Sequence, residues 1–228
     1  MRLIVRGLRA AGLEPRVQAP FRNVVATIPG SRRGTVVLGA HHDTKDIPGF
    51  VGANDGASGV AVLLELARVL PNPNPGPSVA LAFFDGEEAP GSEQFAQLGD
   101  RGSRQFVRYA RRGVRRQGAP ALARIRAVYV LDMVGDCSLQ IPREASSDRG
   151  LYRRLHGPAF GGTTGRILDD HTPFEQAGIP AVDVIDFSYG PGGTPGAWWH
   201  TTEDSLDKVC AGSLGQVGVA VQNALGTL

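Results

Sequence analysis

Three short segments of this 228-residue chain are almost continuously apolar, and each is followed directly by acidic residues or histidines. These segments are residues 35–40, 78–84 and 125–131. Apolar and β-branched runs that do not alternate with polar residues are typical of strands buried on both faces, as in a parallel sheet. A chain built around such strands needs a layer of helices on each side of its sheet.

Segments with helical spacing alternate with these strands, which favours an α/β fold. Apolar residues recur at helical positions over residues 56–70, and the Pro- and Gly-rich residues 71–77 after them predict a loop. The other expected elements are strands at 23–28 and 181–185 and helices near 3–13, 103–117, 147–155, 173–177 and 213–225. We therefore predict a three-layer α/β/α sandwich with a mixed, largely parallel central sheet. It would form one catalytic domain over residues 1–228, with its first helix cut by the start of the sequence.

Composition and missing motifs exclude several classes of protein. A net charge of +2 with 20% charged residues argues against a disordered tail or a nucleic-acid partner, and no apolar run is long enough to span a membrane. The chain has neither a phosphate-binding GK[ST] motif nor a GxSxG nucleophile motif. Cys137 and Cys210 stand alone, which excludes a disulfide scaffold and a thiolate zinc finger. Any metal must therefore bind histidines and carboxylates.

Polar side chains follow the three apolar strands at the point where each strand ends. His41 follows the first strand, Glu87 and Glu88 follow the second, and Asp132 follows the third. Each residue alone has an ordinary explanation, just as Asp55 could simply cap the next helix. Ligands of open α/β sheets bind beyond the carboxyl ends of the strands, so these distant clusters are expected to meet at one edge. Imidazole nitrogens and carboxylate oxygens are suitable zinc ligands there.

Five short motifs carry a resemblance that covers nearly the whole chain. They are AHHDT at 40–44, GANDGASG at 52–59, FDGEE at 84–88, LDMVG at 131–135 and WHT at 199–201. In this order they resemble the ligand motifs of zinc peptidase family 28, which contains bacterial zinc aminopeptidases and animal-type glutaminyl cyclases and has a zinc exopeptidase-like fold. The resemblance implies that Glu87 is the acid/base and that Asp43 orients His41. The metal ligands that it implies are His41, Asp55, Glu88, Asp132 and His200.

The two branches of the family use this ligand set differently. In the aminopeptidases the residue matching Asp55 bridges two zinc ions, whereas in the cyclases one zinc is held by the residues matching Asp55, Glu88 and His200. The segment DDHTPF at 169–174 resembles the cyclases. There its first acid, Asp169, is implied to share hydrogen bonds with the acid/base Glu and the residue matching Asp132. Animal cyclases have His where this chain has Asp183, which is a departure from their pattern.

Two tryptophans precede the last ligand candidate. Trp198 and Trp199 lie in a Gly- and Pro-rich loop beside His200, and we expect at least one of them to contact substrate. We assign this role to Trp199 and Trp198 together, because the sequence does not separate them.

Together these features predict a zinc enzyme that acts on the N-terminal residue of peptides. Our first hypothesis is a glutaminyl-peptide cyclotransferase with one zinc ion, and our second is a zinc aminopeptidase with two. A non-catalytic binding protein on the same fold is a remote third hypothesis. Peptide N-termini are the expected partners, without nucleic acid or membrane, and the oligomeric state stays open. The first residues do not resemble a signal peptide, so the sequence as written points to the cytoplasm. A secreted or periplasmic protein stays open if the N-terminus is trimmed.

Overall fold

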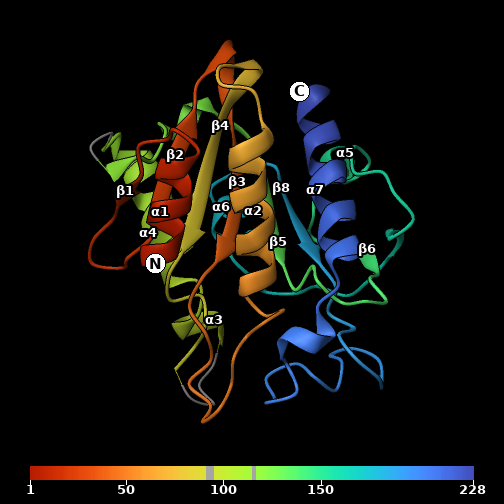
Figure 1. The fold of residues 1–228 in the computed structure, drawn as a ribbon. Coiled ribbons are helices and arrows are strands. Elements are labelled where there is room, and N and C mark those ends of the chain that lie inside the picture. Colours follow the sequence, from red (N-terminus) through yellow and green to blue (C-terminus); the bar gives the residue numbers. More distant parts are fainter. Residues whose placement is uncertain (91–94, 115–116) are drawn as a thin grey trace.

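A six-stranded mixed sheet lies at the centre of the computed structural model, which describes residues 1–90, 95–114 and 117–228 (Figure 1). Its strand order is β1-β2-β4-β3-β5-β8. The last four strands in this order are parallel, whereas β2 runs antiparallel to both β4 and β1. The strands are β1 (Arg16–Val17), β2 (Val24–Ile28), β3 (Gly30–His41), β4 (Asn74–Phe84), β5 (Ile125–Asp132) and β8 (Ala181–Ile185).

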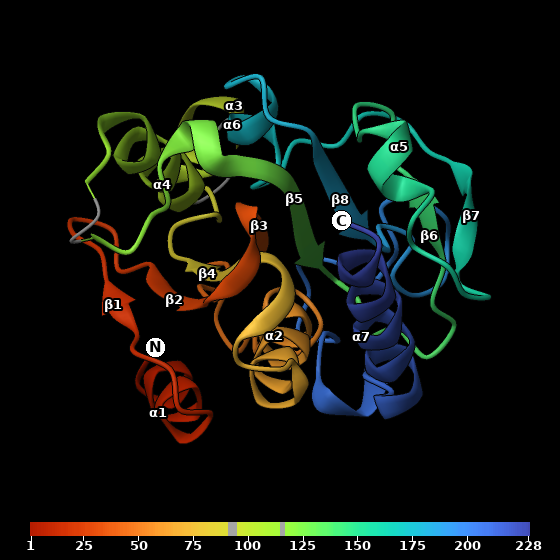
Figure 2. The same ribbon diagram turned by 90° about the horizontal axis from the view of Figure 1, so that it is seen from above.

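Helices cover both faces of this sheet, as the view from above shows (Figure 2). One face carries α1 (Arg2–Ala10), α2 (Ala57–Val69) and α7 (Ala211–Gly226). The other carries α3 (Phe95–Leu98), α4 (Arg101–Arg112) and α6 (Thr172–Glu175). The short elements are α5 (Arg149–Tyr152), a two-stranded sheet of β6 (Ile141–Arg143) and β7 (Phe160–Thr163), and the 3₁₀ turns η2 (Leu122–Arg124) and η3 (Leu206–Lys208). The predicted three-layer sandwich with a mixed, largely parallel sheet is confirmed.

Alternate side chains of the central strands enter two separate cores. Val36 and Leu38 pack into the core under α1, α2 and α7, whereas Val37 between them packs into the core under α4 and α6. Phe83 and Phe84 of β4 divide between the two cores in the same way. Successive strand residues point to opposite faces, so a strand covered on both sides must be apolar throughout. This explains the continuous apolar runs in the sequence.

The strands β3 and β4 extend further than the sequence predicts. Residues 30–34, which precede the strand expected at 35–40, belong to β3, and the loop expected at 71–77 is strand from Asn74 onward. These two segments pair with each other. Register shifts between them accommodate glycine and proline at the strand ends. The helix expected at 103–117 ends at Arg112, since Gly113 adopts a left-handed conformation with φ of 62°. Residues 115–116 lie outside the described part of the chain.

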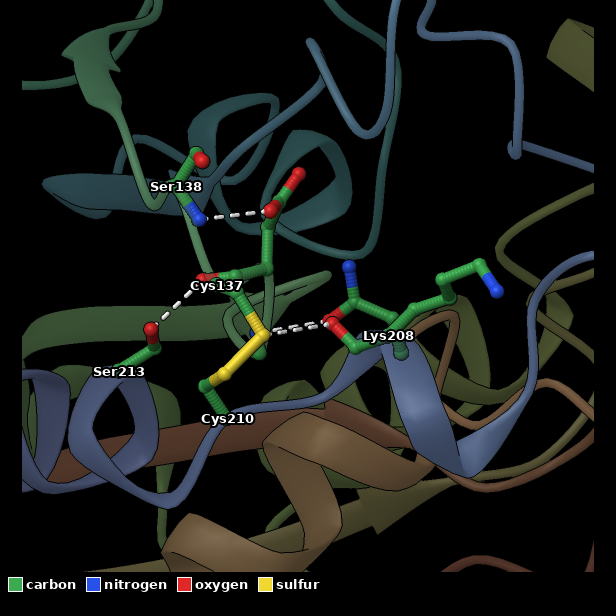
Figure 3. The surroundings of a disulfide bond; sticks show 8 residues. Cys137, Ser138, Lys208, Cys210 and Ser213 are labelled. Atoms are coloured by element: carbon green, nitrogen blue, oxygen red, sulfur yellow. Dashed lines mark hydrogen bonds between the residues drawn. A yellow bond between two sulfur atoms is a disulfide. The ribbon is translucent and has the colours of Figure 1, made fainter.

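A disulfide between Cys137 and Cys210 joins the segment after β5 to the start of α7 (Figure 3). The two residues are 73 positions apart, with a Cα–Cα distance of 4.9 Å. Nearby, the Ser213 hydroxyl donates to the carbonyl of Asp136, and the Cys210 amide donates to the carbonyl of Gly135. The sequence analysis did not pair these two cysteines, because neither a motif nor a short spacing reveals their proximity. Among the described residues, no helix has the length and apolarity needed to cross a bilayer.

Removing this disulfide should destabilise the protein without changing its fold. We expect Cys137→Ser/Cys210→Ser to lower the free energy of unfolding by about 2–4 kcal/mol, because the link closes a long loop in the unfolded chain. Urea denaturation followed by circular dichroism measures the difference. Wild type unfolded with a reductant is the matched control and should resemble the variant. Equal stability of oxidised wild type and the double variant would contradict the prediction.

Candidate functional site

The carboxyl edge of the parallel strands gathers the predicted site residues. His41 and Asp132 are the last residues of β3 and β5, and Glu87 and Glu88 follow the end of β4. The arrowheads of β4 and β8 point to the same end of the sheet (Figure 1). Asp55 reaches this edge from the turn before α2. All five side chains are buried, so their charges must be neutralised locally.

Two groups of potential metal ligands share Asp55. In the first, Nε2 of His41 lies 3.2 Å from Oδ1 of Asp55 and 3.1 Å from Oδ1 of Asp132. In the second, Nε2 of His200 lies 3.4 Å from Oδ2 of Asp55 and 3.2 Å from Oε1 of Glu88. The two oxygens of Asp55 thus face different histidines. The structure brings together all five ligand candidates of the sequence analysis.

Asp204, which the sequence analysis did not identify, fixes the turn that carries Asp55. Its Oδ1 and Oδ2 accept hydrogen bonds of 2.8 and 3.0 Å from the backbone amides of Asn54 and Asp55. The hydroxyl of Tyr189 also donates to Asp204 Oδ1, at 2.8 Å. Asp204 is four residues after His200, so it connects the loop of one ligand to the turn of another. The only signal for Asp204 in the sequence is its position three residues after the WHT motif at 199–201.

Asp43 makes hydrogen bonds to the backbone of Glu87 and Glu88 but not to His41. Its carboxylate accepts hydrogen bonds from the amides of Glu87 and Glu88, at 3.2 and 3.1 Å. The distance from Asp43 Oδ1 to Nδ1 of His41 is 3.7 Å, which is too long for a hydrogen bond. Burial acts to raise the pKa of Asp43, but His41 and the two amides outweigh burial and lower it. Asp43 therefore couples the ends of β3 and β4.

Lys45 is a second residue that the sequence analysis missed. Its ammonium donates to the carbonyl of Ala89 at 2.8 Å and lies 3.4 Å from Oε2 of Glu88. It thus faces the carboxylate oxygen that does not point to His200. The sequence did offer a signal, because Lys45 is one of only two lysines in the chain and lies two residues after Asp43.

Glu87 lies in a group of buried acids. Carboxylate oxygens of Glu87, Asp100 and Asp169 lie within 4.8 Å of one another, and all three residues are buried. Burial, together with the negative charge of Asp169, raises the pKa of Glu87 well above its usual value. Burial likewise raises the pKa of Asp100 to about 7, and burial with the charge of Asp132 raises that of Asp169. Asp100 can therefore hold a proton near neutral pH, and the pKa values of Glu87 and Asp169 shift in the same direction.

The two tryptophans point to different surroundings. Trp199 stacks on the His200 ring, with centroids 3.9 Å apart, and Phe187 packs edge-on against Trp199 at 5.1 Å. Trp198 instead packs against Tyr189 at 5.3 Å and lines a pocket of about 290 Å³ with Asp136 and Asp186 among its other residues. Trp199 therefore lies beside the ligand candidates, whereas Trp198 belongs to a neighbouring pocket.

The donor set of the two ligand groups suits a divalent metal ion. Oδ2 of Asp55, Oε1 of Glu88 and Nδ1 of His41 are buried without a hydrogen-bond partner. Buried polar atoms are normally satisfied, and a coordinated cation would satisfy both carboxylate oxygens. Burial raises the pKa of Asp55 to about 6, and a nearby cation would oppose this effect.

Comparisons with known proteins agree on one family. Residues 23–225 match the family model described as peptidase family M28. A glutaminyl-peptide cyclotransferase of Drosophila melanogaster is 28% identical over 224 residues, which cover 83% of this chain and 60% of that protein. Aminopeptidase YwaD of Bacillus subtilis is 30% identical over 205 residues, which cover 83% of this chain and 40% of that protein. The chain thus spans less than two thirds of the length of these curated relatives.

A solved structure extends the same comparison to the fold. The crystal structure of a glutaminyl cyclase from an Acidobacteriales bacterium superposes with a TM-score of 0.85 and 32% identity. The alignment covers 99% of this chain and 84% of that one. The resemblance inferred from five short motifs is confirmed by these findings.

Zinc binding should depend most strongly on the shared carboxylate. We expect Asp55→Ala to weaken zinc binding at least about 100-fold, because both ligand groups lose a donor, whereas His41→Ala affects only one group. Isothermal titration and the metal content after dialysis measure this. Asp207→Ala, at an exposed acid outside the site, is the control and should bind zinc like wild type. Wild-type zinc affinity in Asp55→Ala would show that zinc binds elsewhere.

Proposed function

This chain belongs to peptidase family M28, and we propose that it is a zinc-dependent glutaminyl-peptide cyclotransferase that converts an N-terminal Gln into pyroglutamate and ammonia. One observation carries the choice of reaction. Asp169 is buried in the same acid group as Glu87, where it can share protons with the proposed acid/base. The similarity to glutaminyl cyclases supports this choice. We propose that residues 1–228 contribute one catalytic domain.

Zinc would be held by Asp55, Glu88 and His200, and when bound it supplies a positive charge that polarises the γ-carboxamide carbonyl of the substrate. Glu87 takes a proton from the α-amino group as the amine nitrogen attacks the γ-carboxamide carbon. It then passes this proton to the departing ammonia, so the C–N bond that forms replaces the one that breaks. Asp132 and Asp169 adjust the charge of Glu87 during both transfers, because Asp169 lies beside Glu87 and the charge of Asp132 acts on Asp169.

A zinc aminopeptidase is the second candidate, because Asp55 connects two complete ligand groups. In that enzyme His41, Asp55 and Asp132 would hold one zinc ion, and the second would occupy the group of the cyclase. Glu87 would then take a proton from the attacking water and pass it to the leaving amine. The similarity to an aminopeptidase supports this candidate. A non-catalytic binding protein is the weakest candidate, since Glu87 has no evident purpose in it.

Peptide N-termini are the proposed substrates, and Trp199 is the proposed contact for them. It lies beside His200 and is only partly buried, together with Phe187. Trp198 is not proposed for this role, because it packs on Tyr189 away from the ligand groups.

We further propose that the enzyme works in an oxidising compartment, as a secreted or periplasmic protein. The Cys137–Cys210 disulfide supports this location over the cytoplasm, because disulfides persist where thiols are not kept reduced.

Replacing the acid/base should separate catalysis from metal binding. We expect Glu87→Gln to lower kcat by about 10²–10⁴-fold while zinc content stays at the wild-type level, because the amide cannot carry the proton and Glu87 is not a proposed ligand. Ammonia release from a Gln-initiated peptide measures kcat, and elemental analysis measures zinc. Near-normal turnover in this variant would move the proton transfer to another residue.

The reaction itself distinguishes the two enzymes. Wild type should release ammonia from a Gln-initiated peptide without cleaving a peptide bond, and Asp169→Ser should slow this reaction at least about 10-fold with zinc retained. Asp186→Asn is a matched control, because Asp186 is a buried acid whose carboxylate accepts from the amides of Gln140 and Ser188. Hydrolysis of a leucine anilide without ammonia release from Gln peptides would assign the protein as an aminopeptidase instead.

A further inference from the structure

His171 is the fully buried histidine of the acid-rich interior behind Glu87. It lies in the turn that begins α6, and its side chain is completely inaccessible. Nε2 lies 3.3 Å from the hydroxyl of Ser146 and 3.5 Å from Oε2 of Glu144. Nδ1 faces the opposite way and lies 3.7 Å from Oδ2 of Asp183. The ring therefore stands between two buried carboxylates.

Asp183 links His171 to the acid group. It is a fully buried residue in the middle of β8, and potential ligand atoms of Asp169, His171 and Asp183 lie within 4.8 Å of one another. Both carboxylate oxygens of Asp183 and Nδ1 of His171 are without a hydrogen-bond partner. A small rotation of the ring or the carboxylate would bring these unsatisfied groups into contact. Such a contact is favourable because each is costly to leave unpaired when buried.

The carboxylates around Asp183 and Asp169 need a positive charge nearby to compensate their burial. Asp169 is itself within 4.8 Å of Glu87 and Asp100, so several buried carboxylates adjoin one another. Within the described residues, no Lys or Arg side chain forms an ion pair with Asp169 or Asp183. Burial acts to lower the pKa of His171, but the carboxylates of Glu144 and Asp169 outweigh burial and raise it. Arg104 instead lies 3.9 Å from Asp100, so His171 is the cationic group that faces Asp183 and adjoins Asp169.

We propose that His171 is a positioning residue for the acid/base: as an imidazolium it holds Asp183 and Asp169 in the arrangement in which Asp169 faces Glu87. The order of contacts is His171, Asp183, Asp169, Glu87. This proposal rests on the proposed role of Glu87 and goes beyond it, because His171 touches neither the ligand groups nor the reacting atoms. On the other side, Glu144 is held by the amides and hydroxyls of Ser146 and Ser147, so the Nε2 side of the ring has a rigid support.

Steady-state kinetics of variants that remove the charges of His171 and Asp183 tests the proposal. We expect His171→Gln to lower kcat about 10- to 100-fold with KM and zinc content unchanged, because Asp183 loses its cation and Asp169 its fixed orientation. In His171→Gln/Asp183→Asn two neutral amides replace the charged pair, so kcat should recover to within about 3-fold of wild type. Glu65→Gln is the control. Glu65 is an exposed acid of α2 that pairs with Arg68 and should be kinetically silent.

Several results would overturn the proposal. They are an unchanged kcat in His171→Gln, an equal loss in the single and double variants, and a rise in KM at constant kcat. The ¹⁵N spectrum of histidine-labelled wild type gives a reading that does not depend on the variants folding. Both ring nitrogens of His171 should carry protons at pH 7.5, and a neutral ring would also overturn the proposal.

The assay also separates this proposal from the proposed function. If wild type hydrolyses anilides instead of cyclising Gln peptides, the cyclase assignment fails. The same variants measured in hydrolysis then still decide the role of His171, because Glu87 is the proposed base in both reactions. If wild type catalyses neither reaction, both proposals fail together.

Discussion

Burying a carboxylate costs several kcal/mol unless a cation, a shared proton or hydrogen-bond donors compensate it. This protein buries many of them at one edge of its sheet, and the compensation differs from place to place. Asp204 and Asp43 are satisfied by pairs of backbone amides. Asp55 and Glu88 face histidines and retain unpartnered oxygens, which suits a metal ion. Asp100 faces Arg104, whereas Asp169 and Asp183 lie beside the imidazole of His171.

This division follows from a single short loop after β4. Glu87 and Glu88 are consecutive, and their amides are bound by the two oxygens of Asp43. With the backbone fixed in this way, Glu88 faces His200 while Glu87 enters the group formed with Asp100 and Asp169. The two neighbouring carboxylates therefore meet different surroundings, one able to bind a cation and one able to hold a proton. Different surroundings of this kind are the usual basis for dividing ligand and acid/base roles between two carboxylates.

The sequence predicts the site residues that follow a recognisable strand. It misses the residues whose role depends on a partner far away in the chain. Continuous apolar runs identify β3, β4 and β5, and the polar residues after them identify His41 and Asp132, because strand ends in a parallel sheet must meet. Asp100, Asp204 and His171 carry no such signal, since each matters only through a partner far away in the chain. The Cys137–Cys210 disulfide was missed for the same reason. The extension of β4 into a proline-rich segment depends on its pairing with β3.

Asp132 belongs to the first ligand group and also adjoins the acid group. It is 3.1 Å from His41, as a metal ligand of the first group would be, and its charge also acts on Asp169. If His171 keeps Asp183 and Asp169 in place, Asp169 would compete with a metal ion for the carboxylate of Asp132. A metal ion in the first group would need that carboxylate as an undivided ligand. The buried imidazole behind Glu87 would thus favour one ion over two, although it lies outside both ligand groups.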